Sequence, residues 1–269
     1  MRKITFLSLV FSIIFFCSQA QDKPPSENQA AASNALNPVA QVIKFQMQPN
    51  YSVFNSGMQQ LNLMTRVILP LKGVVGPFVK PKNGKLFSLV RFEIPVISQT
   101  DHADGSLSAT GLGDITLSDV ITIKTDWGKF GAGPCFGFPS ATKPSIGSGK
   151  WTIGIAALAL YHKKPSYMIG LILNQYFSYA GPPDRPDKNY MTVQPFFDFI
   201  FHKGYFIMIN PILTFDWQKE DYSVPLALGF GKAFAKNLSA YIMPEYIVSG
   251  STKGSWVIQF NLNTMFGGQ

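Results

Sequence analysis

Apolar and polar residues alternate with a period of two along most of the chain. Between residues 43 and 48, for example, Ile43, Phe45 and Met47 are separated by polar side chains. This period is that of a β-strand with one apolar and one polar face. We predict twelve such strands, at Ile43–Val53, Leu61–Leu69, Leu86–Ile94, Asp114–Ile123, Lys129–Phe138, Trp151–Tyr161, Tyr167–Phe177, Asn189–Phe199, Tyr205–Phe215, Tyr222–Phe230, Leu238–Val248 and Trp256–Phe266.

Most predicted strands have the length that a membrane-spanning strand needs. About ten tilted residues cross a bilayer as a β-strand, whereas a spanning helix needs about 18 or more apolar residues. After residue 20 the longest apolar run, 151–161, is too short for such a helix. Because backbone groups in hydrocarbon must be paired within the protein, we predict an all-β fold, a transmembrane antiparallel up-and-down β-barrel of about twelve strands in residues 42–269.

The connections and the tryptophans are typical of a barrel in an outer membrane. An even number of strands puts both termini on one side, so short periplasmic turns should alternate with longer outer loops. Two connections break this alternation, because the hairpin at 55–57 is short and the connection 71–84 is long. All four tryptophans fall at predicted strand ends or in adjoining turns, where lipid headgroups lie: Trp127, Trp151, Trp217 and Trp256.

The first 41 residues have the composition of an export signal followed by a leader. Two basic residues, an apolar run and Ser18-Gln19-Ala20 predict a signal peptide at 1–20, cleaved after Ala20. Residues 21–41 are rich in Ala, Asn, Gln, Ser and Pro, and we expect either a flexible periplasmic leader or a short plug in the barrel. Cleavage would leave Cys135 as the only cysteine, so the fold cannot depend on an internal disulfide.

The composition indicates lipid rather than nucleic acid around the protein. The net charge of +8 falls to +6 on loss of Arg2 and Lys3, and the other basic residues are scattered singly, which disfavours nucleic-acid binding. Charged residues are only 14% of the chain, which contains 23 phenylalanines, so much of the surface must face an apolar medium. We expect outer-membrane lipids and the barrel assembly machinery as partners, in the cell outer membrane of a Gram-negative bacterium.

No arrangement of residues predicts catalysis. His102, His162 and His202 fall in predicted loops without metal-ligand spacing, and we interpret them as solvated turn residues. His102 and Ser106 share one polar loop that offers a lipase neither rigid support nor an oxyanion site. The glycine segments 111–114 and 147–150 do not complete a phosphate-binding loop. We predict no enzyme activity, no cofactor and no metal site.

Strand parity directs several charged side chains into the barrel, where charges at membrane depth are tolerated. The same face carries apolar residues, among them Met64, Phe87 and Tyr241. A lumen of this kind suits partly apolar solutes, although the charges could instead pair with one another and rigidify the interior. The candidate solute contacts are Lys44, Arg66, Arg91, Glu93, Asp198, Asp216 and Glu245.

An ordered series of short motifs runs through the chain: Asn37-Pro38-Val39-Ala40, Arg91 with 94–99, Gly111-Leu112-Gly113-Asp114-Ile115, Gly131-Ala132-Gly133-Pro134, 138–142, Gly147-Ser148-Gly149-Lys150-Trp151, Asn174 with 178–181, Asp184-Arg185-Pro186-Asp187, Gln194-Pro195-Phe196 and Gly229-Phe230-Gly231-Lys232. With these motifs the sequence resembles the outer-membrane family named for the meta-pathway of phenol degradation, whose members are often labelled transporter or neuromedin U. The resemblance implies a β-barrel channel for small solutes, hydrophobic or aromatic ones among them. The loop positions that it carries over are Gly111, Gly113, Asp114, Gly149, Lys150, Trp151, Asp184 and Arg185.

We therefore expect a porin-like outer-membrane channel or transporter that passes small solutes by passive diffusion. A plugged structural, ligand-binding or adhesion barrel is the main alternative, and a lipid-modifying outer-membrane enzyme is less favoured. A soluble periplasmic β-sandwich is a further alternative, because alternation does not distinguish lipid from a protein core.

Overall fold

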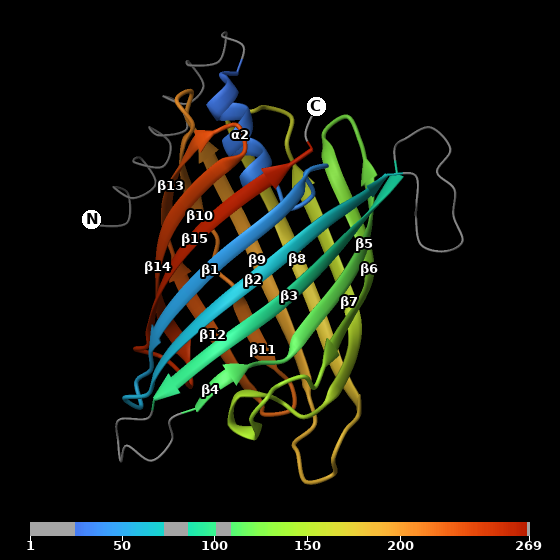
Figure 1. Cartoon of the computed structure of the whole chain (residues 1–269), viewed down its shortest axis with the longest axis vertical. Coiled ribbons are helices and arrows are strands. Elements are labelled where there is room, and N and C mark those ends of the chain that lie inside the picture. Colours follow the sequence, from blue (N-terminus) through green and yellow to red (C-terminus); the bar gives the residue numbers. More distant parts are fainter. Residues whose placement is uncertain (1–24, 73–85, 101–108, 268–269) are drawn as a thin grey trace, which may run out of the picture.

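The computed structural model describes residues 25–72, 86–100 and 109–267. The predicted signal peptide, most of the 71–84 connection and the loop that holds His102 and Ser106 lie outside these residues. The described chain begins with helix α2 (Glu27–Leu36) and continues almost entirely in β-strands (Figure 1). None of its helices has the length and apolar character that a membrane span requires.

One closed antiparallel sheet forms the barrel, which confirms the predicted fold class. The chain crosses this sheet twelve times, and we call each crossing a stave. Nine staves are single strands, and three are each made of two strands in line. The last strand pairs with the first, with Phe266 opposite Ile43 and Trp256 opposite Val53, so the sheet has no free edge. In chain order the staves are β1 (Ile43–Val53), β2 (Gln59–Lys72), β3 (Leu86–Thr100), β4 (Ala109–Leu112) with β5 (Ile115–Lys124), β6 (Gly128–Phe138), β7 (Trp151–Tyr161), β8 (Tyr167–Ala180), β9 (Asn189–Ile200), β10 (Tyr205–Ile209) with β11 (Leu213–Asp216), β12 (Asp221–Ala227) with β13 (Gly229–Ala235), β14 (Leu238–Gly250) and β15 (Trp256–Phe266).

Two of the strand predictions were wrong in one respect. The strands predicted at Tyr205–Phe215 and Tyr222–Phe230 are each interrupted. The pairing between these neighbouring staves stops after Met208–Gly229 and resumes at Thr214–Ser223. Residues 209–213 and 224–228 therefore face each other without ladder pairing. On the β9 side, residues 210–212 and 194–196 are likewise unpaired. Residues 210–212 and 194–196 each contain a proline, which has no N–H to donate. We call residues 209–213 and 224–228 the seam.

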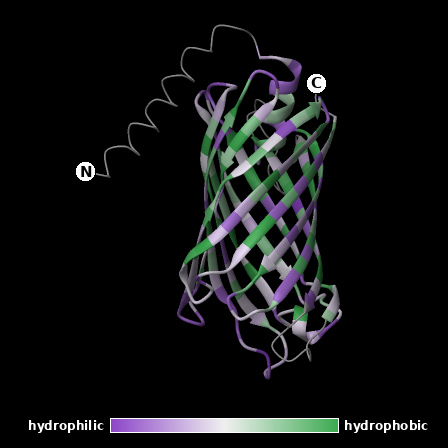
Figure 2. Ribbon diagram, turned by 90° about the vertical axis from the view of Figure 1, so that its left-hand side faces the viewer, coloured by the Kyte–Doolittle hydropathy of each residue, from purple (hydrophilic) through white to green (hydrophobic). Residues whose placement is uncertain are grey.

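The outer face of the barrel is apolar, as a lipid-facing surface must be. Hydrophobic and hydrophilic residues alternate along the strands (Figure 2), and large side chains such as Ile155, Leu226 and Phe230 are among the most exposed. Aromatic rings pair at both ends of the wall, with Tyr51 beside Trp256 at one end and Trp127 beside Phe130 at the other. These pairs form the two aromatic girdles at the membrane interfaces.

One carboxylate departs from this apolar surface. Register places Asp119 of β5 opposite Val90, on the outer face, between the inward-facing Ser118 and Val120. The hydroxyl of Ser88 on the neighbouring strand donates a hydrogen bond to it. Because lipid offers no partner for a carboxylate, this hydrogen bond within the wall lowers the cost of the exposed charge.

Helix α2 lies at the end of the barrel where β15 ends (Figure 1). The connections described at this end are short, for example 125–127 and 236–237, whereas those at the opposite end include the long 139–150 and 181–188. Short turns are typical of the periplasmic side, so we call the α2 end periplasmic and the opposite end outer. Ser26 caps the helix by accepting a hydrogen bond from the Gln29 amide, and an Ala-rich sequence follows.

Candidate functional site

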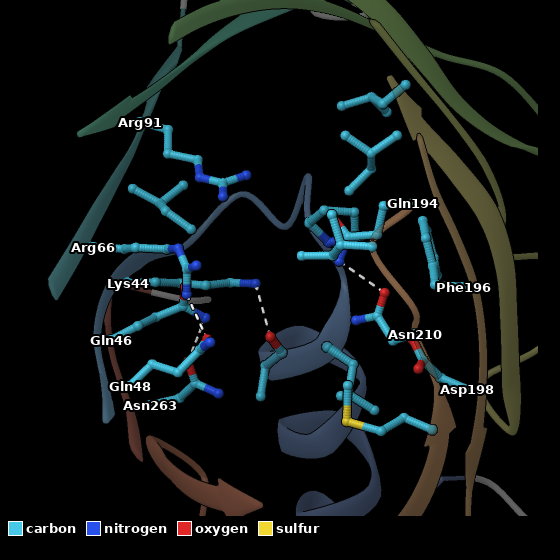
Figure 3. A pocket seen from close by; sticks show the side chains of 18 of the residues that line it. Lys44, Gln46, Gln48, Arg66, Arg91, Gln194, Phe196, Asp198, Asn210 and Asn263 are labelled. Atoms are coloured by element: carbon cyan, nitrogen blue, oxygen red, sulfur yellow. Dashed lines mark hydrogen bonds between the residues drawn. The ribbon is translucent and has the colours of Figure 1, made fainter. Parts of the chain in front are cut away.

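The candidate site is the lumen of the barrel. Inward side chains and the C-terminal end of α2 enclose a cavity of about 150 Å³. Its lining combines charged residues with apolar ones such as Leu158, Ile172 and Met208. Figure 3 shows this cavity with the basic side chains, Gln46, Gln48 and Asn263 on one side and Gln194, Asn210, Phe196 and Asp198 on the other.

The basic side of the lumen, which we call the basic wall, consists of Lys44, Arg66 and Arg91 on the adjacent strands β1, β2 and β3. Glu93 is the carboxylate that pairs with both arginines. Its Oε1 lies 2.6 Å from Nε of Arg66 and also accepts a hydrogen bond from Nη2 of Arg91. Two guanidinium groups thus share one carboxylate, and Lys44 adds a third basic side chain to this part of the lumen.

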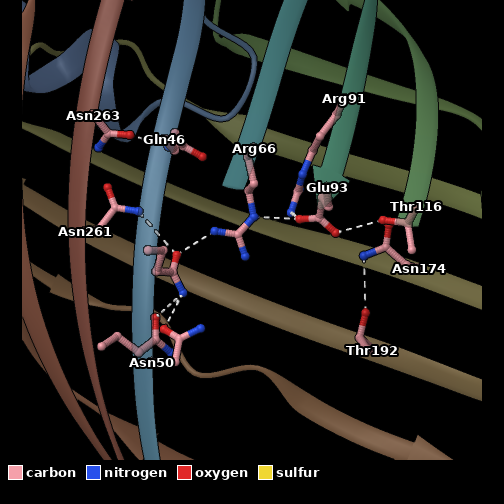
Figure 4. A network of polar contacts seen from close by, with 12 residues as sticks. Gln46, Asn50, Arg66, Arg91, Glu93, Thr116, Asn174, Thr192, Asn261 and Asn263 are labelled. Atoms are coloured by element: carbon pink, nitrogen blue, oxygen red, sulfur yellow. Dashed lines mark hydrogen bonds and ion pairs between the residues drawn. The ribbon is translucent and has the colours of Figure 1, made fainter. Parts of the chain in front are cut away.

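A polar network extends the basic wall around the barrel (Figure 4). Gln48 is its centre, because its Oε1 accepts from Nη1 of Arg66 at 2.5 Å and its Nε2 donates to Gln259 at 2.8 Å. Gln259 in turn donates to Glu245, while Thr116 donates to Glu93 at 3.1 Å. Nearly every polar atom in this network has a partner, so the wall between β5 and β14 is rigid.

The opposite side of the lumen is less polar. Gln194 of β9 donates to Asn210 of the neighbouring β10–β11 stave at 2.8 Å, and Phe196 is buried beside them. Asp198 is only 2% exposed, and its Oδ1 has no hydrogen-bond partner. No salt bridge or side-chain hydrogen bond from any described residue reaches this carboxylate.

Helix α2 plugs the periplasmic end of the lumen. Its small residues Ala31, Ala32 and Ala35 are buried, which allows the helix to pack closely inside the wall. Lys44, itself 1% exposed, donates from Nζ to the carbonyl oxygens of Ala35 at 3.0 Å and of Asn37 at 2.5 Å. A lysine at this position satisfies helix C-terminal carbonyls that have no partner within the helix.

Further contacts fix the plug to the periplasmic turns. Ser33 Oγ lies 3.1 Å from Nε2 of His162, and Lys129 Nζ donates to the Val39 carbonyl at 2.8 Å. Burial, together with the nearby charge of Lys129, lowers the pKa of His162. His162 is therefore a plug contact, and the prediction that it is only a solvated turn residue was wrong.

The family-motif positions gather at the outer end, where they order the long loops. Asp114 accepts hydrogen bonds from the amides of Ala141 and Ser148, at 3.2 and 2.6 Å. Arg185 donates from Nη2 to the carbonyl oxygens of Pro144 and Gly147, both at 2.6 Å. These bonds tie the 139–150 loop to the β4–β5 stave and to the 181–188 loop.

The remaining motif positions have local roles. Gly149 has a φ of +70°, and a Cβ there would lie 2.9 Å from Nε of Arg185, so glycine is required. Lys150 is buried and pairs with Asp187 at 3.0 Å, and the hydrogen bond from Lys150 lowers the pKa of that carboxyl. The other motif residues lie on the strands and loops nearby. Gly111 is on β4, Gly113 is between β4 and β5, Trp151 is at the start of β7, and Asp184 is exposed in its loop.

All seven charged side chains that parity directed inward are on the inner face. Lys44, Arg66, Arg91 and Asp198 line the cavity, and Glu93 and Glu245 belong to the polar network. Asp216 lies apart from them at the outer end, where it accepts hydrogen bonds from the amides of the turn after β11. Whether these residues contact a solute stays a prediction.

Sequence reasoning missed the neutral amides of the site. Gln48, Asn174, Gln194, Asn210 and Gln259 line the cavity or its network, although only charges were selected as candidates. The period-two pattern contains this signal, since each of these residues has inward parity. Among the described residues, no group of three His, Cys, Asp or Glu side chains could hold a metal ion.

These features define a twelve-stranded transmembrane β-barrel of the outer-membrane type. No protein-family model matches the sequence, and no curated protein matches it significantly. Among solved structures, the chain is similar to the COG4313 outer membrane channel from Pseudomonas putida F1, with a TM-score of 0.62 and 12% identity over 84% of this chain and 94% of that one. It is also similar to the NanC porin (0.54, 8% identity, 82% and 98%) and to the translocator domain of the autotransporter NalP from Neisseria meningitidis (0.51, 11%, 88% and 93%).

Proposed function

We propose that this barrel is an outer-membrane channel through which small solutes cross by passive diffusion. The observation that carries the proposal is the cavity in the lumen, whose lining mixes charged, amide and apolar side chains. A purely structural barrel of twelve strands has no need of such a cavity. Its apolar lining suits solutes that are themselves partly apolar, aromatic compounds among them.

A second cavity supports the proposal. It lies at the outer end and is lined by inward residues such as Gln60, Asn62 and Lys150. Thr116 and Tyr190 line the same cavity and also border the polar network, which lies nearer the periplasmic end. Solute would thus meet a polar vestibule first and the mixed lumen afterwards.

The similarity to the COG4313 channel and to NanC, which is named a porin, agrees with transport as the function. The motifs shared with the phenol-degradation family agree with aromatic solutes. Membership of that family is part of the proposal, since it depends on the motifs alone.

The plug favours one competing function, a barrel that binds a ligand without passing it. Helix α2 occupies the periplasmic end and is held there by the buried Lys44, and the segment just after it by the half-buried Lys129. Under the channel proposal, α2 must leave or shift for solute to pass. Under the alternative it never does.

Solute entry into proteoliposomes separates the two functions. Swelling should be faster with the wild-type barrel than with empty liposomes when a small aromatic solute is supplied, and faster still with a variant that lacks residues 25–36. Native folding of both proteins is checked by their mobility on gels before and after boiling. If neither protein speeds entry, the channel proposal is wrong and the closed, ligand-binding barrel is favoured.

A further inference from the structure

Two charged groups that line the same lumen cavity each have a buried atom without a hydrogen-bond partner. They are Nε of Arg91, on β3, and Oδ1 of Asp198, on β9. A buried charged atom that has neither water nor a partner is costly, so such atoms are rare in proteins. Two such atoms in one cavity indicate places where a bound ligand would supply the missing hydrogen-bond partners.

The two groups stand on opposite sides of the lumen (Figure 3). Arg91 belongs to the basic wall, where three basic side chains lie near one carboxylate, Glu93, which pairs with the two arginines, so this side has an excess of positive charge. Asp198 faces the cavity from the other side, and no salt bridge joins it to a cation among the described residues. Because the barrel holds β3 and β9 apart, Arg91 and Asp198 cannot neutralise each other directly.

Apolar side chains line the space around these two groups. Ile172, Leu158 and Met208 contribute to the lining, and so do Leu89 and Phe196. The cavity of about 150 Å³ holds about ten water-sized groups if each needs roughly 10–15 Å³. A compact molecule with about ten non-hydrogen atoms therefore has the right size.

We propose that the lumen cavity is a binding site for a small zwitterion of the amino-acid class, with its carboxylate toward Arg91, its ammonium toward Asp198 and an apolar body between them. This inference rests on the proposed channel function and names the class of solute. A singly charged molecule of the same shape would satisfy only one of the two atoms. A zwitterion satisfies both and adds no net charge to the lumen.

The test uses ion current through the purified full-length barrel in planar bilayers. Three probes share one aromatic ring: phenylalanine as the zwitterion, phenethylamine as the cation and 3-phenylpropionate as the anion. We expect phenylalanine to interrupt the current at concentrations about tenfold lower than either analogue, since each charge-assisted hydrogen bond contributes about one such factor.

Variants assign the two ends of the ligand. Asp198→Asn should remove the advantage of phenylalanine over 3-phenylpropionate, and Arg91→Lys should reduce its advantage over phenethylamine. Asp119→Asn is the matched control, because that carboxylate is also on the barrel wall and hydrogen-bonded, by Ser88, but it lies on the outer face and does not line the cavity. In this control the preference for phenylalanine should be unchanged.

The possible results are distinguishable. If the wild-type barrel conducts ions but all three probes block it equally, the zwitterion site is refuted while the channel stands. The same conclusion follows if Asp119→Asn abolishes the preference as completely as Asp198→Asn does. If the folded barrel conducts no ions at all, the proposed function fails, and the inference fails with it.

Discussion

The ammonium of Lys44 lies 2.5 Å from the carbonyl oxygen of Asn37, so the first strand of the barrel holds the end of the helix that precedes it. The same ammonium reaches the Ala35 carbonyl. A positive charge at a helix C-terminus also interacts favourably with the helix dipole. One side chain thus couples the plug to the wall.

Replacing this lysine should loosen the plug without unfolding the barrel. In Lys44→Met the side chain keeps much of its length, but two carbonyl oxygens lose their donor. We expect amide hydrogen exchange in α2 to become about tenfold faster, the factor that corresponds to roughly 1–2 kcal/mol for a hydrogen bond from a charged donor. Mass spectrometry of the peptide that contains residues 27–36 measures this rate. In the control Lys236→Met, whose pairing with Glu27 is exposed, exchange should not change.

Glu93 should matter more for stability than any other single carboxylate of the network. In Glu93→Gln the guanidinium groups of Arg66 and Arg91 lose their shared counter-ion. We expect a loss of about 1–3 kcal/mol, below the 3–5 kcal/mol of a fully buried pair because these side chains are 14–31% exposed. The urea concentration at which the folded gel band disappears reports the change.

A surface ion pair is the control for this stability measurement. Lys219 lies 3.8 Å from Asp216, and it is 63% exposed. Exposed pairs contribute about 0–1 kcal/mol, so Lys219→Gln should leave the urea midpoint almost unchanged. An equal shift in both variants would contradict the assignment of Glu93 as the carboxylate that holds the arginines together.

Acidic pH should weaken the plug through His162. Burial lowers the pKa of His162 in the folded protein, so the unfolded chain, with a pKa near 6.5, takes up a proton more readily. Stability that this residue contributes is complete above about pH 6.5 and is lost as the pH falls toward the folded-state pKa. Relative to the intrinsic rate of amide exchange at each pH, exchange in α2 should accelerate between pH 7 and pH 5, and His162→Gln should remove that acceleration. If His162→Gln shows the full acceleration while His202→Gln abolishes it, the assignment is wrong.

The seam should be the least protected part of the wall. Asn210 and Ile212 lack ladder pairing on both sides, because the pairing with β9 and with the β12–β13 stave is interrupted at the same height. Their amides should exchange at least tenfold faster than those of the flanking Met208 and Thr214, as expected when local opening needs no broken hydrogen bond. Residue-resolved exchange by NMR in detergent measures this difference. Equal protection along the stave would show that the seam is closed in solution.

The period of two was sufficient to predict the barrel and the direction of its charges. Strand parity depends only on local geometry, which explains why Lys44 and Asp198 could be placed inside without knowledge of their neighbours. The interruption near Pro211 was not predicted, because it depends on Pro195 lying opposite on another strand. That relationship is a matter of long-range register, which a single sequence does not specify.

The composition of residues 21–41 allowed a plug but did not distinguish it from a flexible leader. Residues 27–36 are polar and Ala-rich, and such a segment has no apolar stripe that would indicate burial. It is buried because a polar lumen can accept it, with Lys44 as a donor to the Ala35 carbonyl and Lys129 as a donor to the Val39 carbonyl just after the helix. Asp119 is a different case. Parity gives the outward direction of its side chain, but the hydrogen bond from Ser88 that makes a carboxylate acceptable there comes from the neighbouring strand.

Single-channel recording in planar bilayers tests the central claim most directly. We predict discrete conductance steps for the wild-type barrel and a higher open probability for Lys44→Met, because the weakened plug leaves the periplasmic end of the lumen more often. The result that would contradict the account is a correctly folded barrel, wild type and Lys44→Met alike, that produces no conductance steps.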